Sequence, residues 1–283
     1  MHVDEHTIEV AGAPVFYRRA PPPEAMAPSR ATGATPLYLH SVPTSSDDWL
    51  GFLERTGGIA PDLLGFGRSS KAGNLDYSLP AYADFVAAFL DTLGVQRVAL
   101  IGHGWGAAIA LAFAQRRPER VGQVAIIDAL PLLEGFRWPA LVRRWRAPVL
   151  GELIMGSITK RQLARTLRAG AADPGAWPDE RAAAVWEQFD QGTQRAILRL
   201  HRSIDPPGLA AAGAGLARLR APALVVWGER DPWLHPSFAD VYAQRLPRAS
   251  LERVDNAGHW PWLDQPGVIE RVLAFLAQPT PAP

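Results

Sequence analysis

Short apolar runs alternate with amphipathic segments along most of this 283-residue chain. Two runs near the N-terminus, 6–10 and 13–19, are joined through Ala11 and Gly12, a pair typical of a hairpin turn. Further apolar runs predict strands at 36–40, 57–63, 97–103, 121–129, 222–229 and 250–258. Apolar residues at helical spacing predict helices at 45–55, 79–94, 106–117, 236–246 and 266–278. Strands that alternate with helices at short spacing form a mostly parallel sheet flanked by helices, so the pattern predicts an α/β fold.

The alternation stops between residues 131 and 218. This interval has no convincing strand, and its helical segments include 139–145, 158–170 and 179–189. We therefore expect a core formed by residues 1–130 and 219–283, with residues 131–218 inserted after the sixth strand as a helical cap. The interval contains 12 Arg and 1 Lys against 8 acidic residues. This local excess of positive charge either attracts an anionic substrate or, more simply, lies on solvated helix faces.

Composition removes several classes of protein from consideration. The net charge is +1, which gives no general reason to expect binding to nucleic acid or to an anionic membrane. The absence of cysteine excludes disulfides, thiolate metal sites and a cysteine nucleophile. The sequence has no secretory signal pattern and no apolar run long enough to span a membrane, so we expect a soluble cytoplasmic protein. It also has no metal-ligand cluster and no glycine-rich phosphate loop, and we expect neither a metal nor an organic cofactor.

The segment GHGWG at 102–106 follows a predicted strand and opens a helix. Its spacing is that of a nucleophile elbow, a sharp turn that presents the attacking side chain, and the attacking position is Gly104. Two other polar residues follow later strands in the order expected for this arrangement, Asp231 as the acid and His259 as the base. A carboxylate can hold the imidazole in one tautomer while the second ring nitrogen acts as a base. Asp128, at the end of the sixth strand, is the alternative acid.

A second polar stretch, HSVPTSSDDW at 40–49, follows the third predicted strand. Backbone N–H groups near such a strand end stabilise negative charge that develops on a substrate oxygen. Val42 and Trp105 are the candidate donors through their main chains, and His40 is a further candidate for oxyanion or substrate binding.

Taken together and in this order, these motifs resemble the α/β-hydrolase superfamily over nearly the whole chain. Within it, the PTSS run at 43–46, the GFGRSSK run at 65–71 and Trp105 are most similar to haloalkane dehalogenases and epoxide hydrolases. The resemblance implies an α/β-hydrolase fold with a helical cap and a small-molecule substrate. It also implies an aspartate nucleophile, or a serine if the chain belongs to the esterase and C–C hydrolase branches.

The chain departs from that pattern in four ways. Gly104 supplies no attacking atom, although glycine relieves the strain of the turn. Residues 40–43 correspond to the H-G-x-P segment called the oxyanion strip, and Ser41 replaces its usual glycine. Val42 cannot bind halide as an asparagine at that position would. All five tyrosines lie outside the predicted cap, whereas epoxide hydrolases use cap tyrosines. A halide site would require Trp105 with one cap tryptophan, from Trp138, Trp145, Trp177 and Trp186.

Three interpretations follow from the glycine at position 104. The chain is a binding protein that reuses a hydrolase pocket, an enzyme in which His259 acts as general base without a side-chain nucleophile, or an inactivated variant of an ordinary hydrolase. We expect the second, a hydrolase of a small apolar ester, haloalkane or epoxide, and the sequence leaves its oligomeric state open.

Overall fold

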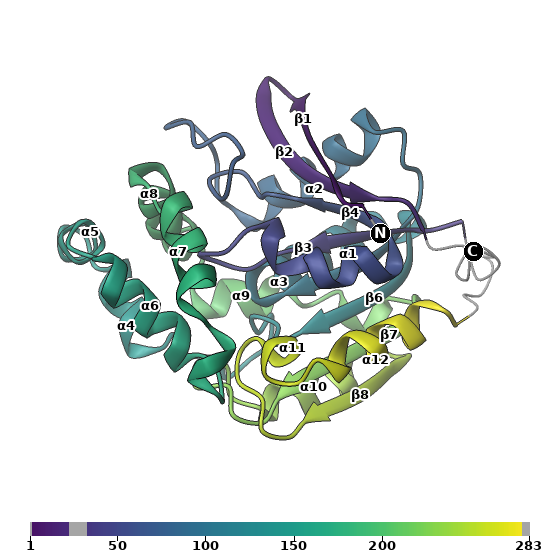
Figure 1. The fold of residues 1–283 in the computed structure, drawn as a ribbon. Coiled ribbons are helices and arrows are strands. Elements are labelled where there is room, and N and C mark those ends of the chain that lie inside the picture. Colours follow the sequence, from purple (N-terminus) through teal and green to yellow (C-terminus); the bar gives the residue numbers. More distant parts are fainter. Residues whose placement is uncertain (1, 23–32, 279–283) are drawn as a thin grey trace.

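The computed structural model describes residues 2–22 and 33–278, and its centre is an eight-stranded sheet (Figure 1). The strands are β1 (Asp4–Val10), β2 (Ala13–Ala20), β3 (Thr35–Leu39), β4 (Gly58–Pro61), β5 (Val98–His103), β6 (Val121–Ile127), β7 (Ala223–Gly228) and β8 (Ala249–Val254). Their order in the sheet is β1-β2-β4-β3-β5-β6-β7-β8. The β1–β2 and β2–β4 pairs are antiparallel, and the pairs from β4–β3 to β7–β8 are parallel. The predicted α/β-hydrolase fold is confirmed.

The core helices are α1 (Leu50–Thr56), α2 (Leu79–Thr92), α3 (Gly104–Arg116), α10 (Ser237–Arg245), α11 (Pro261–Asp264) and α12 (Gly267–Leu276). Helix α1 packs against α12, and both lie in front of the sheet in Figure 1, whereas α2 packs against α3 on the other side. Strands β5, β6 and β7 are buried along their whole length, because helices cover both faces of the sheet. Their unbroken apolar runs made them the clearest strands in the sequence.

The predicted helix at 45–55 begins differently. Residues Ser46–Trp49 form a 3₁₀ turn before α1, and the Ser45 side chain accepts the Asp47 N–H as the N-cap. The predicted strand 121–129 is also too long, because β6 ends at Ile127 and Asp128 turns the chain at φ +40°.

The helices between β6 and β7 are α4 (Ala140–Arg146), α5 (Leu150–Gly156), α6 (Lys160–Ala169), α7 (Asp179–Gln188), α8 (Gln191–Arg202) and α9 (Pro206–Ala212). Helices α4 to α8 lie to one side of the sheet in Figure 1. Helix α9 lies beside α3, where the Gln115 side chain donates to the Ala212 carbonyl at 3.0 Å. The sequence singled out α4, α6 and α7, and α5, α8 and α9 were not identified. In the described ranges, no helix is both long and apolar enough to cross a bilayer.

Candidate active site

The turn between β5 and α3 has the tight geometry of a nucleophile elbow. Gly104 holds φ +51°, a conformation that costs a non-glycine residue about 1–3 kcal/mol. A Cβ at Gly102 would lie 2.6 Å from the Ala107 Cα, and one at Gly106 would lie 2.1 Å from the Leu39 carbonyl oxygen. The path of the backbone therefore requires glycine at 102 and 106, whereas at 104 it imposes strain on any other residue.

The serine of the oxyanion strip fills space that a side chain at position 104 would need. A Cβ built on Gly104 would lie 2.2 Å from Ser41 Oγ and 2.8 Å from Ser41 Cβ, both too close for real atoms. The same point is 3.6 Å from His259 Nε2. The absence of a side chain at 104 and the presence of one at 41 are therefore complementary, and each position restricts what the other can hold.

His40 holds the oxyanion strip through hydrogen bonds between its ring and the backbone. Its Nδ1 lies 2.7 Å from the Ser41 carbonyl oxygen, and its Nε2 accepts the Leu63 N–H at 2.9 Å. Burial lowers the pKa of His40, which keeps the ring neutral with its proton on Nδ1. His40 does not line the cavity described below. Both ring nitrogens are thus bonded to backbone groups, and a place for His40 in oxyanion or substrate binding stays a prediction.

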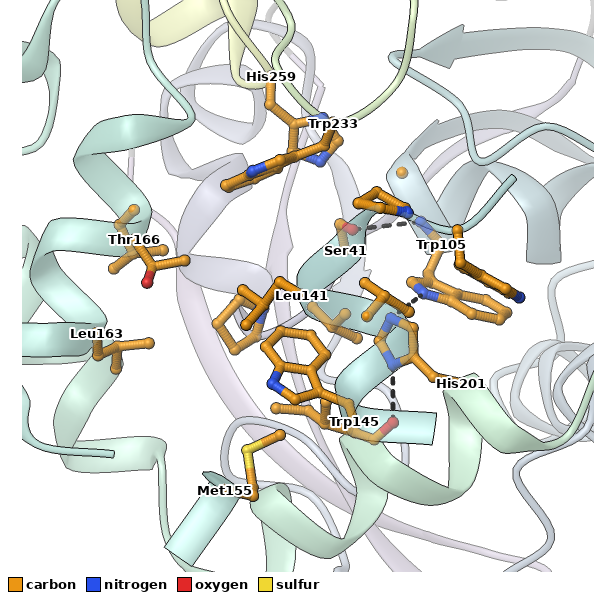
Figure 2. Close-up of a pocket in the computed structure, with 18 of the residues that line it drawn as sticks. Ser41, Trp105, Leu141, Trp145, Met155, Leu163, Thr166, His201, Trp233 and His259 are labelled. Atoms are coloured by element: carbon orange, nitrogen blue, oxygen red, sulfur yellow. Dashed lines mark hydrogen bonds between the residues drawn. The ribbon is translucent and has the colours of Figure 1, made fainter. Parts of the chain in front are cut away.

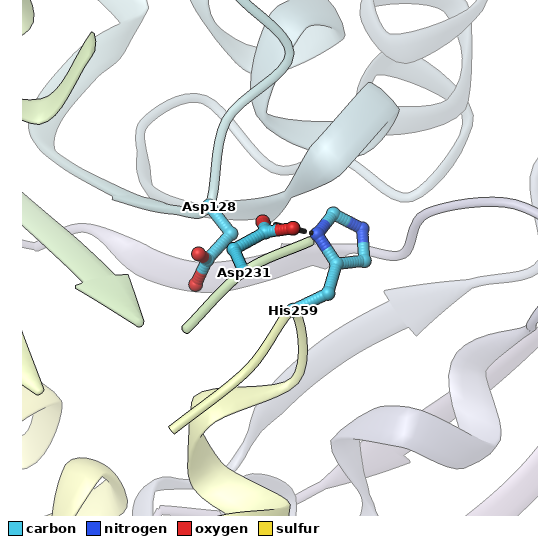
Figure 3. A group of neighbouring side chains, drawn as sticks. All are labelled: Asp128, Asp231 and His259. Carbon is cyan, nitrogen blue, oxygen red and sulfur yellow. Dashed lines mark hydrogen bonds and ion pairs between the residues drawn. The ribbon is translucent and has the colours of Figure 1, made fainter. Parts of the chain in front are cut away.

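Asp231 and His259 meet at the ends of the two strands predicted to carry them (Figure 3). Asp231 Oδ2 lies 2.7 Å from His259 Nδ1, and both side chains are buried. The other carboxylate oxygen accepts the backbone N–H groups of Trp233 and Leu234, at 2.8 and 3.0 Å. Asp231 is thus held at both oxygens, and it orients the imidazole so that Nε2 faces Gly104.

His103, the residue before the elbow position, contacts the base rather than the cavity. Its Nε2 lies 2.7 Å from the His259 carbonyl oxygen, and the two rings are 4.5 Å apart. Burial, and then proximity to His259, holds the pKa of His103 well below its usual range, so Nε2–H of a neutral ring is the donor. His103 therefore fixes the loop that carries His259, a role that the sequence did not reveal.

Asp128 lies next to Asp231 without reaching the imidazole (Figure 3). It is fully buried, and its Oδ1 accepts the Gly228 N–H at 3.1 Å. Burial first, and the neighbouring Asp231 carboxylate second, raise the pKa of Asp128 well above its usual range. A neutral Asp128 can donate to Asp231, so the geometry makes Asp231 the direct partner of His259 and Asp128 a support for it.

Asp128, Asp231 and His259 also bring three possible metal-ligand atoms within 4.8 Å of one another. A metal bound by all three through His259 Nδ1 would break the 2.7 Å contact between that nitrogen and Asp231. It would also require Asp128 to ionise in a buried position where its pKa is raised. The donor set therefore suits a hydrogen-bonded acid–base pair better than a metal centre.

A cavity of about 310 Å³ opens between the core and the helices α4 to α8 (Figure 2). Gly104, Ser41, Val42 and His259 line its core side. Its opposite wall is mostly apolar and includes Leu141, Trp145, Met155, Leu163 and Phe189. Such a cavity suits a small molecule with one polar group held near His259.

Both N–H groups of Trp105 are already engaged. The backbone N–H donates to Ser41 Oγ at 3.2 Å, and the indole N–H donates to His201 Nε2 at 3.2 Å (Figure 2). His201 Nδ1 lies 2.7 Å from the Ile197 carbonyl oxygen, and burial lowers the pKa of His201 to about 4, so the ring is neutral. His201 is a site residue that the sequence did not identify, since α8 itself was not predicted.

Of the four tryptophans in the predicted cap, only Trp138 and Trp145 line the cavity. Trp138 stacks on Trp105 with ring centroids 5.9 Å apart. Trp177 packs against Trp260, and Trp186 stacks on Phe189. No tyrosine lines the cavity in the described part of the chain, as the distribution of tyrosines in the sequence suggested.

Comparison with known proteins agrees with the fold and the motif order. The alpha/beta hydrolase family matches residues 37–272, and the chain belongs to this family. A haloalkane dehalogenase from Mycobacterium marinum is 32% identical, with 87% of this chain and 85% of that protein covered. A 2-hydroxymuconate semialdehyde hydrolase from a Pseudomonas species is 27% identical, with 78% and 76% covered.

Among solved structures, haloalkane dehalogenase DbeA from Bradyrhizobium elkani matches with a TM-score of 0.82 and 26% identity, covering 98% of each chain. The protein is therefore an α/β hydrolase related to haloalkane dehalogenases. Its site departs from the motif pattern of these relatives at three residues. They are Gly104, Ser41 and Trp105, whose indole N–H donates to His201.

Proposed function

We propose that the protein hydrolyses a small, largely apolar molecule with His259 as general base and no side-chain nucleophile at position 104. The observation that carries the proposal is the placement of His259 Nε2, 3.6 Å from the point where a side chain at 104 would begin, at the wall of the cavity. Asp231 holds the other ring nitrogen, so Nε2 is free to accept a proton from the attacking group. The oxygen that gives its proton to His259 Nε2 would face a substrate bound in the cavity.

Among ester, haloalkane and epoxide substrates, the site favours an ester. The Val42 N–H has no acceptor among the described residues, and Val42 directly follows Ser41, whose Oγ accepts the Trp105 backbone N–H. The Val42 N–H, together with the Trp105 N–H once Ser41 Oγ releases it, suits the oxygen of a tetrahedral acyl intermediate. The Trp105 indole, which a departing halide would need, donates to His201, and no described tyrosine is placed to polarise an epoxide.

The second candidate is a protein that binds a small apolar ligand without turning it over. The feature that favours it is the hydroxyl of Ser41, which occupies one of the two oxyanion donors by accepting the Trp105 N–H. In that case the elbow and the Asp231–His259 pair would serve only as the walls of a ligand pocket.

Turnover of a panel of short-chain nitrophenyl esters, haloalkanes and epoxides by the wild-type protein and His259→Ala separates these functions. We expect ester hydrolysis in the wild type, reduced about 10²–10⁴-fold in His259→Ala because the general base is lost. His235→Ala, which removes an exposed histidine, is the matched control and should leave the rate unchanged. Equal rates in wild type and His259→Ala would overturn the proposal, and saturable binding without turnover would establish the second candidate.

A further inference from the structure

The attacking group of the elbow is absent, but a hydroxyl stands directly beside its place. The resemblance implies glycine at position 41 and a nucleophile at position 104, and this chain has the reverse. Because Ser41 Oγ lies 2.2 Å from the point where the missing side chain would begin, the two positions have in effect exchanged residues. We propose that Ser41 is the nucleophile of this protein and forms an acyl-enzyme with carboxylic ester substrates, an inference that rests on the proposed ester hydrolysis.

The Ser41 hydroxyl is placed to act rather than merely to fill space. Its Oγ accepts the Trp105 N–H, and its hydrogen has no acceptor among the described residues. Ser41 lines the cavity while being only 2% exposed, so its hydroxyl is accessible from the cavity and otherwise enclosed. The backbone carbonyl of Ser41 is fixed by Nδ1–H of His40 at 2.7 Å.

The oxyanion donors remain suitable after the exchange. With a nucleophile at 104, the donors would be the N–H of the next residue, Trp105, and the N–H of Val42 across the strip. With Ser41 as nucleophile, Val42 becomes the next residue, and Trp105 becomes the donor across the strip. The same two N–H groups therefore serve either position.

The base lies close to the same point. Ser41 Oγ is 2.2 Å and His259 Nε2 is 3.6 Å from the position of a Cβ at 104. The two groups form no hydrogen bond in this structure. Hydrogen bonds of this kind tighten when a substrate binds, because the ligand excludes water and fixes the side chains.

The reaction then follows in two balanced steps. Ser41 Oγ attacks the ester carbonyl carbon and passes its proton to His259 Nε2, while the oxyanion accepts from Val42 and Trp105. Cleavage of the bond from that carbon to the alkoxy oxygen releases the alcohol, which takes the proton from His259. Water then attacks the acyl carbon and gives a proton to His259, and cleavage of the bond to Ser41 Oγ releases the acid and restores the Ser41 hydroxyl.

The test combines covalent labelling with kinetics on the full-length protein. An alkyl fluorophosphonate is incubated with the wild type, Ser41→Ala, His259→Ala and the control Ser203→Ala, which removes an exposed serine outside the cavity. Intact mass and peptide mapping then locate the adduct. Nitrophenyl butyrate hydrolysis is followed before and after the first turnover, and thermal unfolding verifies that each variant is folded.

We expect one adduct on Ser41 in the wild type and in Ser203→Ala, and an initial burst of nitrophenol. We also expect kcat/KM to fall about 10³-fold or more in Ser41→Ala. Retained hydrolysis in a folded Ser41→Ala protein, with loss only in His259→Ala, would overturn Ser41 as nucleophile and leave general-base attack by water. An adduct on Ser41 without turnover would support attack by Ser41 and overturn ester hydrolysis, and neither adduct nor turnover would overturn both.

Discussion

The two halves of the site differ in how closely they match the motif pattern of α/β hydrolases. On the acid–base side, at the ends of β7 and β8, Asp231 and His259 stand in the expected order and 2.7 Å apart. On the nucleophile side, at the ends of β3 and β5, glycine stands at 104 and serine at 41. The elbow geometry itself is retained, since Gly104 holds φ +51°.

This difference shows which parts of the site constrain one another. Asp231 is bonded at both carboxylate oxygens, and His103 fixes the loop of His259, so each group on the acid–base side is held by several contacts. On the nucleophile side, residues 41 and 104 compete instead for the same space. A side chain at 104 therefore fits only when the side chain at 41 is removed, because both would occupy the same space.

The two carboxyls on the acid–base side provide the largest expected effect. Asp231→Asn should lower ester hydrolysis about 10⁴-fold, because an amide cannot hold His259 in the required tautomer. Asp128→Asn should have little effect, because Asp128 is neutral in its buried position and an asparagine also offers a donor to Asp231 and an acceptor to the Gly228 N–H. Steady-state kcat/KM for both variants, from one substrate and one buffer, measures the contrast.

The same pair also tests whether a metal takes part. Dialysis against a chelator should leave the activity of the wild type unchanged, because Asp231 already occupies His259 Nδ1. Equal losses in Asp128→Asn and Asp231→Asn, together with inactivation by the chelator, would contradict the assignment of Asp231 as the direct partner and favour a metal held by the three residues.

A double-mutant cycle at positions 41 and 104 tests the nucleophile side most directly. Gly104→Ser alone should be destabilising, because a positive φ costs about 1–3 kcal/mol and the new Cβ would overlap Ser41. Ser41→Gly with Gly104→Ser should retain only the backbone strain. The free energy of unfolding, measured in denaturant, should therefore show the double variant to be more stable than the sum of the single variants predicts.

The same two positions decide whether a nucleophile reintroduced at 104 restores activity. Serine or aspartate introduced at 104 should work only when Ser41 is glycine, because the contact distances leave no room for both side chains. Ester hydrolysis in the serine double variant, or haloalkane turnover in the corresponding aspartate variant, would identify the ancestral nucleophile. Additive unfolding free energies would contradict the proposed exchange.

The sequence predicted all eight strands and the order of elbow, acid and histidine, because these depend on local periodicity and on where strands end. It could not reveal that the Ser41 side chain points at Gly104, since that contact joins two strand ends far apart in the chain. The sequence leaves Asp128 open as an alternative acid, and only the fold places Asp231 between it and the imidazole (Figure 3). The contacts of His40 with Ser41 and Leu63 could not be predicted for the same reason, because the fold sets them.

His201 is the clearest omission and gives the smallest expected effect. It lies on α8, which the sequence did not identify as a helix, and nothing in the neighbouring residues distinguishes this histidine from a surface one. His201 accepts the Trp105 indole N–H and so connects α8 to the nucleophile side. A substitution of His201 therefore tests whether that side depends on this neutral histidine.

Protonation of His201 should make stability depend on pH. The folded pKa is about 4 against an ordinary 6.5, so between these values the unfolded chain binds the extra proton and stability falls as the pH falls. Between pH 7.5 and pH 5, the wild type should lose about 2 kcal/mol more than His201→Gln, which cannot titrate. Denaturant unfolding at both pH values measures this difference, in which the buried His40 and His103 cancel because both proteins contain them. An equal loss in the two proteins would mean that the pKa of His201 is the same in the folded and unfolded chains, which would contradict a ring held neutral by burial.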